Sequence, residues 1–217
     1  MSYYFSYLPD IYVGSKQLDS DKITYVKVKN IFRRIKARED LGQYITFLEQ
    51  YQIGTNERPY NVASKVYGDS RLDWVVLLTN NIIDVYEEWP RTPGEFDRML
   101  KEKYGPNKDG LHHYETAEIK DPQGKIILRG GLIVQSNFRY KMPDGTYYPN
   151  PIIPVSNFEY EDRINEDKRG IYLLKAEFID QFIYEFMKLT EYDQNEELED
   201  PNTKKTPLSN VANFLDY

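Results

Sequence analysis

The side chains best suited to chemistry are two adjacent histidines, His112 and His113, in a chain that contains no cysteine. Adjacent residues on a β-strand point to opposite faces, so these two imidazoles could bind one metal ion only if the backbone bent between them. No His-Glu-x-x-His pattern surrounds them. We therefore interpret both as surface or turn histidines and expect no metal site.

No other group of residues predicts catalysis. The absence of cysteine excludes thiol nucleophiles and thiolate metal sites, and no spacing of acidic residues marks a glycosidase pair. Gly130 and Gly131 lie between Leu128 and Leu132 without a Gly-Lys-Ser sequence, which favours a bend between strands over a phosphate-binding loop. The sequence predicts a protein without enzymatic activity, cofactor or small-molecule substrate.

The charge and hydropathy of the chain limit the classes of partner that it can have. Of its 217 residues, 35 are acidic and 28 basic, and the net charge of −7 disfavours nucleic acid as a partner. The basic residues from 33 to 38 precede Glu39 and Asp40 and are typical of a solvated helix face. No segment has the roughly 20 apolar residues needed to cross a membrane. Because residues 1–13 lack a basic leader and contain Pro9, we expect no export signal and synthesis in a reducing cytoplasm.

Aromatic residues are unusually frequent for so polar a chain. The 20 Tyr, 10 Phe and 2 Trp make up 15% of the residues. Tyr and Trp are enriched at protein interfaces because they combine a large contact area with a polar group. This composition predicts extensive contacts with partner proteins, although a tyrosine-rich core is an alternative that the composition leaves open.

Residues 1–50 are predicted to form an aromatic N-terminal arm and a connecting segment. Tyr3, Tyr4, Phe5 and Tyr7 suggest an extended start to the arm. Residues 26–29 alternate valine with lysine, which predicts a strand, whereas Ile31, Phe32 and Ile35 have helical spacing. The boundary between the two patterns stays open.

Residues 51–105 carry the clearest helical signals. Pro59 suits a first helical turn, and the chain can leave that helix at Gly68. Ser70 is then the predicted N-cap of a second helix, which is apolar on most faces and must be buried. The predicted core of this segment consists of Tyr60, Ala63, Val66, Tyr67, Gly68, Leu72, Trp74, Leu77 and Leu78.

Turn residues dominate the next segment, 106–192. Turns at 121–124, 143–145 and 165–170 predict β-hairpins with a strand on each side. A closing helix with Phe178, Ile179, Phe182, Ile183 and Phe186 on one face is expected to pack on that sheet. The predicted fold class is therefore α+β.

The last segment, 193–217, is predicted to be an acidic linker followed by an apolar tail. The linker has too little apolar surface to become ordered by itself. In the tail, Thr206 and Pro207 suit a helix start, and an apolar stripe follows. This stripe either docks into a partner's groove or folds back on its own domain.

Tyr67-Gly68-Asp69 lies between the two predicted helices, and Leu72-x-Trp74 lies in the second. Together with the segments 57–63, 65–69, 72–78, 80–82 and 89–90, these motifs resemble the LysM-like region of the gene product 53 family of baseplate wedge subunits in T-even-type contractile-tail phages. The aromatic opening, residues 5–12, is also similar to the start of that family, and weaker similarity extends over a strand-turn-strand-helix at 158–189.

The resemblance implies a β-α-α-β module and a structural role in a virion. Such a protein would join other wedge subunits and neighbouring wedges around the central hub, near the sheath initiator. Ordinary LysM modules bind N-acetylglucosamine polymers, so a peptidoglycan-binding module is the alternative. The candidate partner interface consists of Tyr4, Phe5, Tyr7, Leu8, Pro9, Tyr12, Trp89, Leu208, Val211, Phe214 and Leu215.

Overall fold

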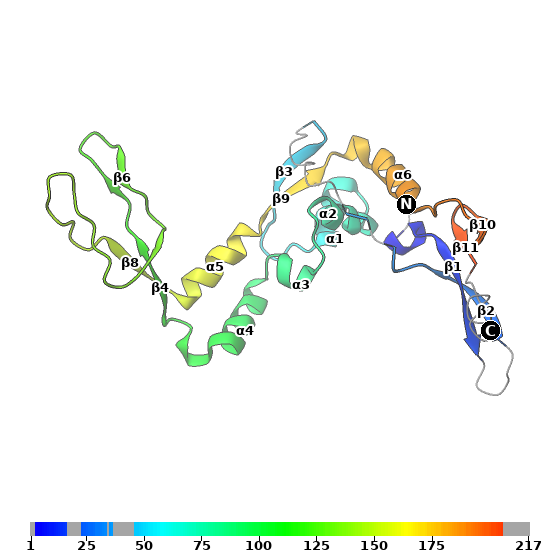
Figure 1. Cartoon of the computed structure of the whole chain (residues 1–217), viewed down its shortest axis with the longest axis horizontal. Helices are drawn as coiled ribbons and strands as arrows, with labels where there is room; N and C mark the ends of the chain where they lie inside the picture. The colour runs from blue at the N-terminus through cyan, green and yellow to red at the C-terminus, as the bar shows by residue number, and fades with distance from the viewer. Residues whose placement is uncertain (1–2, 17–22, 34, 37–45, 206–217) are drawn as a thin grey trace, which may run out of the picture. The chain divides into compact units, whose positions relative to one another are not determined.

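The computed structural model describes residues 3–16, 23–33, 35–36 and 46–205. Over these residues the fold is mixed α+β, the class that the sequence predicted, and it contains six α-helices and four small sheets (Figure 1). The chain divides into two compact units. Unit 1 comprises residues 1–53, 57–85 and 171–217, and unit 2 comprises residues 54–56 and 86–170. The division into four consecutive segments stays a prediction.

Two helices with a short connection form the centre of unit 1. Helix α1 (Pro59–Tyr67) starts with proline at its first position, and the Asn61 side chain accepts a hydrogen bond from the Arg58 N–H at 3.0 Å. The helix ends at Gly68, whose φ of 72° is a left-handed conformation that glycine adopts without strain. The predicted start and end of this helix are both confirmed.

The second helix begins differently from the prediction. A 3-10 turn, η3 (Ser70–Leu72), precedes helix α2 (Asp73–Thr79). The N-cap of η3 is Asp69, not Ser70, because the Asp69 carboxylate accepts a hydrogen bond from the Arg71 N–H at 3.0 Å. Helix α2 buries Trp74, Val75, Val76 and Thr79, in keeping with its predicted burial on most sides.

The core of this helix pair differs from the predicted set at two positions, Tyr60 and Gly68, of which Gly68 is exposed at the end of α1. Ala63, Leu72 and Trp74 are buried, and Val66, Tyr67, Leu77 and Leu78 are half-buried. Tyr60, however, is 52% exposed. It follows Pro59 at the edge of the apolar stripe, and the buried position in the next turn belongs to Val62, which the prediction omitted.

A two-stranded sheet of the chain pairs strands that are far apart in the sequence. Strand β3 (Leu48–Gln52) pairs with β9 (Gly170–Leu174), as the cyan and yellow strands of Figure 1 show. The N–H of Lys175 donates to the carbonyl of Phe47 at 2.9 Å. We expected the second strand directly after the helix pair. Instead α3 (Val85–Glu88) and α4 (Pro93–Tyr104) follow there, and unit 2 is inserted before β9.

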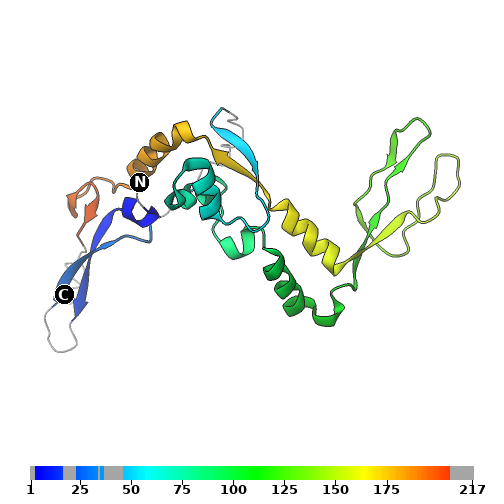
Figure 2. The ribbon, with the colours of Figure 1, turned by 180° about the vertical axis from the view of Figure 1, so that it is seen from behind.

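A second sheet of unit 1 joins the two ends of the described chain. Its order is β10-β11-β1-β2, with β1 (Asp10–Lys16), β2 (Ile23–Lys29), β10 (Leu198–Asp200) and β11 (Thr203–Lys204). Strand β2 confirms the predicted valine-lysine alternation. Figure 2 shows β11, in red, beside the blue β1, and these two strands are parallel.

The predicted acidic linker is therefore wrong for residues 198–204. The Asp200 carboxylate accepts a hydrogen bond from the Asn202 N–H at 2.8 Å, and Thr203 is buried. The Asn202 carbonyl accepts from the N–H of Asp10. Strand pairing with β1 thus supplies the order that the composition of this segment could not predict.

The closing helix, α6 (Ile179–Thr190), follows a 3-10 turn, η5 (Ala176–Phe178). Ile179, Ile183 and Phe186 are buried, which agrees with the predicted apolar face. Its predicted packing on the hairpin sheet is wrong. The ring of Phe186 instead contacts Trp74 of α2, with ring centroids 4.9 Å apart.

Unit 2 contains the hairpins and two charged helices. Its sheets have the orders β7-β4-β8 and β5-β6. The strands are β4 (Leu111–Thr116), β5 (Ile119–Lys120), β6 (Ile126–Leu128), β7 (Ile133–Val134) and β8 (Ile152–Ser156). The predicted hairpin at 121–124 is confirmed between β5 and β6, and the turn at 143–145 is flanked by a single bridge, Lys141 to Tyr147.

The turn at 165–170 has a helix, not a strand, on its N-terminal side. Helix α5 (Asn157–Asp167) begins with a capping box in which the Ser156 hydroxyl accepts a hydrogen bond from the Glu159 N–H at 3.2 Å. The helix is rich in acidic residues, and its few apolar residues form no regular stripe in the sequence. Local capping, rather than hydropathy, determines where it starts.

Candidate interaction site

The N-terminal arm folds onto the helices of unit 1. Its first element is a 3-10 turn, η1 (Tyr4–Tyr7), and not the predicted extended segment. The Ser6 N–H donates to the Tyr3 carbonyl at 2.9 Å, and the Leu8 N–H donates to the Phe5 carbonyl at 3.3 Å. This turn allows Tyr4 and Tyr7 to face the same neighbour.

That neighbour is the indole of Trp74. Its ring centroid lies 5.7 Å from that of Tyr4, 5.6 Å from Tyr7 and 4.9 Å from Phe186. Such separations are typical of favourable tilted ring contacts. We name Tyr4, Tyr7, Trp74, Phe182 and Phe186 the aromatic cluster. Three segments that are distant in the sequence meet in it, so part of the aromatic excess serves the protein's own core.

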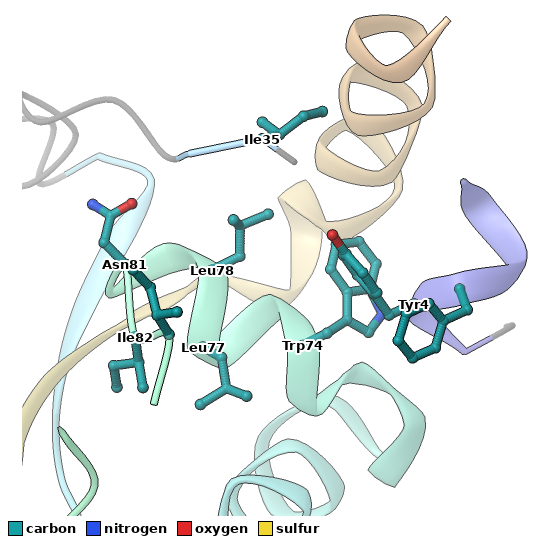
Figure 3. Close-up of a pocket in the computed structure, with 9 residues that line it drawn as sticks. Tyr4, Ile35, Trp74, Leu77, Leu78, Asn81 and Ile82 are labelled. Atoms are coloured by element: carbon teal, nitrogen blue, oxygen red, sulfur yellow. The ribbon is translucent and has the colours of Figure 1, made fainter. Parts of the chain in front are cut away.

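Beside the aromatic cluster lies a pocket of about 380 Å³ within unit 1 (Figure 3). Side chains of the arm, of α2 and of the segment after α2 line it together with Ile35, and none of them is charged. The lining residues are Tyr4, Phe5, Ile35, Trp74, Leu77, Leu78, Asn81, Ile82 and Ile83. The pocket is therefore suited to an apolar group.

Two buried polar atoms at this pocket have no hydrogen-bond partner among the described residues. They are the indole nitrogen Nε1 of Trp74, a donor, and the amide oxygen Oδ1 of Asn81, an acceptor. Figure 3 shows Trp74 with Tyr4 at one end and Asn81 with Ile82 at the other, with Leu77 and Leu78 between them. Leaving such atoms unpaired is unfavourable, typically by about 1–3 kcal/mol each.

The rim of the same helix pair carries an ion pair at the surface. The Arg71 guanidinium donates to Asp69 at 2.9 Å and 2.7 Å and lowers the pKa of that carboxyl to about 2. In the core, burial raises the pKa of the Tyr67 hydroxyl well above its ordinary value. At neutral pH the Asp69 carboxyl is therefore ionised and the Tyr67 phenol neutral, and the ion pair between Asp69 and Arg71 stabilises the loop before η3.

The predicted interface residues have different environments. Phe5 is 57% exposed, and Tyr4, Tyr7 and Tyr12 are partly buried. Leu8 and Pro9 are buried, so their proposed place at an interface is wrong: they anchor the arm to its own unit. Leu208, Val211, Phe214 and Leu215 lie outside the described residues.

Trp89 is also wrong as an interface residue, because it is 1% exposed in unit 2. Phe96 and Leu100 of α4 are buried in the same unit. An isolated tryptophan between charged residues and a proline does not reveal which of its sides a later helix will cover. The residues that the prediction missed at the pocket are Ile35, Asn81, Ile82 and Ile83, of which the Asn-Ile pair lay within the recognised motif.

The two histidines occupy a different arrangement from the one expected. On strand β4, a register shift between Leu111 and His113 bends the backbone, and the two Nδ1 atoms lie 2.7 Å apart. His112 stacks on Tyr160 with ring centroids 3.9 Å apart, and His113 contacts Glu115 at 3.0 Å. Over the residues described, no group of three or more His, Cys, Asp or Glu side chains could hold a metal ion.

Together these features define an α+β protein with an uncharged, aromatic-lined pocket. A family model described as base plate wedge protein 53 matches residues 4–117, more than half of the chain, so the chain belongs to this phage baseplate family. Membership indicates a structural role in the tail baseplate of a virion. No curated protein sequence matches the chain. Among the helices in the described ranges, none is long and apolar enough to cross a membrane.

Proposed function

We propose that this chain is a wedge subunit that joins other wedge proteins, and neighbouring wedges around the central hub, by protein-protein binding. It would assemble in the host cytoplasm and lie near the sheath initiator. The observation that carries the proposal is the family match over residues 4–117, which includes the arm from Tyr4 onward and every residue that lines the pocket. The exposed ring of Phe5 at the pocket supports a role in contact with partners.

We further propose that β3, α1, α2 and β9 form a LysM-like module that unit 2 interrupts. Supporting this, the side chain of Asn80 donates to the carbonyl of Tyr172 at 2.7 Å and accepts from its N–H at 2.8 Å. These two bonds tie the end of α2 to β9. In an uninterrupted β-α-α-β module, a short loop would connect the second helix to the second strand. Here the two hydrogen bonds hold the strand at the end of that helix.

The test is assembly of wedges from purified subunits with and without this chain. We expect Phe5→Glu to reduce incorporation strongly, because a charge would enter an apolar contact. Tyr184→Glu is the matched control, since Tyr184 is a similarly exposed aromatic residue of α6 that does not line the pocket. Equal incorporation of the wild type, Phe5→Glu and Tyr184→Glu would contradict a role for the arm, and failure of the wild type to enter wedges would contradict the proposed function.

The alternative, a peptidoglycan-binding module, makes the opposite prediction. We expect no saturable heat of binding when chitin oligosaccharides are titrated into the protein at millimolar concentration. Saturable binding that Trp74→Phe abolishes would favour the alternative. The uncharged pocket does not by itself separate the two functions. For this reason the wild type and Trp74→Phe are titrated with chitin oligosaccharides in the same experiment.

The C-terminal tail, residues 206–217, remains a proposed helix-in-groove element for a partner. Because Thr203 and Lys204 pair with β1, and residues 198–200 pair with β11, the tail would extend from an ordered hairpin and not from a flexible tether. Deleting 206–217 should leave the melting temperature unchanged but prevent entry into wedges. Loss of folding on deletion would instead show that the stripe belongs to the chain's own core.

A further inference from the structure

We infer that the outer edge of β2 takes up one further strand, an extended segment of another wedge protein in which apolar and acidic residues alternate. This inference rests on the proposed function and adds a second contact, distinct from the pocket. The order β10-β11-β1-β2 leaves β2 at one edge of its sheet among the described residues. An edge strand offers unpaired N–H and C=O groups to a partner that is itself extended.

Asp10 of β1 identifies which backbone groups of β2 point outward. Its N–H donates to the Asn202 carbonyl at 2.6 Å, on the side away from β2, although Asp10 stands opposite Lys29 in the register. The pair of Asp10 and Lys29 is therefore one that exchanges no hydrogen bonds, and every second residue of β2 has the same orientation as Lys29. The N–H and C=O groups of Tyr25 and Lys27 thus point away from β1, and no described residue pairs with them.

The features that usually protect an edge strand are missing from β2. It pairs with β1 over seven consecutive residues without a register shift, and it contains no proline. Its lysines also leave the edge open, because Lys27 and Lys29 turn toward β1, where their Nζ atoms lie 3.5 Å and 3.0 Å from the Asp10 carboxylate. The edge is therefore regular enough to pair with a strand of about five residues.

The side chains of the two-stranded ribbon, β1 and β2, determine which strand fits. Val26 and Val28 share one face with Ile11 and Val13, and Val26 is 50% exposed. Apolar residues of an added strand would cover this face. The opposite face of β2 carries two lysines and no acidic residue, so acidic residues are the favourable cross-strand neighbours there. Because successive side chains of a strand point to opposite faces, one strand meets both conditions when apolar and acidic residues alternate.

Proline at position 25 tests the backbone pairing. Tyr25→Pro removes an N–H that β1 does not use, and proline is tolerated at such outward positions of edge strands. Tyr25→Thr is the matched control, because it also removes the ring but keeps the N–H and suits a strand. Slow hydrogen exchange at the amides of Val26 and Val28, which point toward β1, shows that the ribbon is intact in each variant.

Binding is measured with the full chain and wedges purified from a phage that lacks this chain. We expect Tyr25→Pro to weaken the affinity roughly tenfold or more relative to Tyr25→Thr, because one hydrogen bond is lost and the proline ring hinders the added strand. Equal affinities with an intact ribbon overturn the inference while the proposed function stands. If the wild-type chain itself fails to bind the wedges, the proposed function fails.

A second variant covers the case in which Tyr25→Pro loses the ribbon. Val26→Thr combined with Val28→Thr keeps the shape and strand propensity of both residues but makes the exposed face polar. We expect this double variant to bind the wedges more weakly than the wild type. An unchanged affinity overturns the inference.

A peptide probe identifies the occupant. A blocked heptapeptide of alternating valine and glutamate should slow hydrogen exchange at the Tyr25 and Lys27 amides in a saturable way, as followed by NMR, and the same peptide with lysine in place of glutamate should not. Equal protection by both peptides, or protection by neither, overturns the inference. Protection that rises with protein concentration alone would assign the edge to a second copy, and protection that disappears when residues 206–217 are removed would assign it to the chain's own tail. Either result also overturns the inference.

Discussion

Among the described residues, unit 1 and unit 2 each bury one indole and one phenyl ring, but the buried polar residues of unit 1 are threonines, whereas unit 2 buries a glutamate and two asparagines besides a threonine. In unit 1, the hydroxyls of Thr79 and Thr190 bond to carbonyls of their own helices. In unit 2, Glu161 accepts hydrogen bonds from Lys103 at 2.6 Å and Tyr104 at 2.8 Å, and so connects α5 to α4. Unit 1 therefore depends mainly on packing, and unit 2 depends in addition on paired polar groups.

The difference shows which kinds of change each unit should tolerate. A packed aromatic core loses stability when volume is removed, because the surrounding side chains fill the cavity only in part. A core with a buried carboxylate loses stability when a hydrogen-bond partner of the carboxylate is removed or when the carboxylate is protonated. Either change leaves a buried polar or charged group without its partner, which is unfavourable. Each unit contains one tryptophan, Trp74 or Trp89, so the two can be followed separately.

The largest expected effect comes from removing either tryptophan. Trp74→Ala should lower the free energy of unfolding of unit 1 by roughly 3–5 kcal/mol, and Trp89→Ala should do the same to unit 2. In each variant, urea unfolding followed by the remaining tryptophan should report an unchanged transition in the other unit. Hydrogen exchange at the amides of α2 and α4 measures the loss directly. Simultaneous loss of both units in either variant would contradict their energetic separation.

The next effect concerns the carboxylate of unit 2. Glu161→Gln should lower the stability of unit 2 by roughly 1.5–3 kcal/mol, because two charge-assisted hydrogen bonds become weaker. The control is Glu102→Gln, at an exposed position of α4 in unit 2, which should change little. Urea unfolding of both variants in a Trp74→Phe background makes Trp89 the only reporter. An unchanged midpoint in Glu161→Gln would show that unit 2 is held by packing alone.

Low pH should likewise destabilise unit 2 more than unit 1. Burial tends to raise the pKa of Glu161, but the hydrogen bonds from Lys103 and Tyr104 outweigh burial and lower it; the Arg163 hydrogen bonds lower the pKa of Glu115. A folded pKa below the unfolded one adds stability above about pH 4.3, and this stability is lost as the pH falls through the folded value. Unit 2 should thus weaken below about pH 4.3.

In unit 1, the strongly shifted acid is Asp69 at the surface, where solvent screens its pair with Arg71, so unit 1 should change less over the same range. Urea midpoints at pH 7, 5, 4 and 3, followed by Trp89 alone and by Trp74 alone, check this order. Greater acid sensitivity in unit 1 would reverse the comparison.

The smallest expected effect comes from replacing a glycine of positive φ by alanine, once in each unit. Gly68 ends α1 with a φ of 72°, and Gly124 closes the β5-β6 hairpin with a φ of 84°; a Cβ at either position would meet open space. Gly68→Ala should therefore destabilise unit 1, and Gly124→Ala unit 2, through backbone strain alone, by roughly 1–2 kcal/mol. Urea unfolding measures both. A much larger loss in one unit would indicate that its turn supports distant contacts.

Features with a local cause were predictable from the sequence. Pro59 and Gly68 bound α1, the alternating residues of β2 form a strand, and the turn at 121–124 joins two strands. Each follows from the backbone preferences of a few neighbouring residues. In the candidate site, Trp74 and the leucines of α2 were predicted because a helix that is apolar on most faces must be buried.

Features that depend on distant segments were not predictable in this way. The pairing of β3 with β9, and of β11 with β1, joins residues that no local pattern connects. The burial of Trp89 and the exposure of Tyr60 depend on which neighbours arrive later in the chain. Helix α5 is an intermediate case, since its Ser156-to-Glu159 capping box is readable in the sequence although its hydropathy is not periodic.

The insertion of unit 2 also sets an order of events during synthesis. Strand β9 leaves the ribosome almost 120 residues after β3, and at about 5–20 residues per second this takes roughly 6–24 s. During that interval the edge of β3 has no partner strand and the aromatic cluster lacks Phe186, while the residues of unit 2 are being synthesised and are complete only at its end. The nascent chain is thus most vulnerable to aggregation and proteolysis in its first third, and α6 ends that period when it covers Trp74.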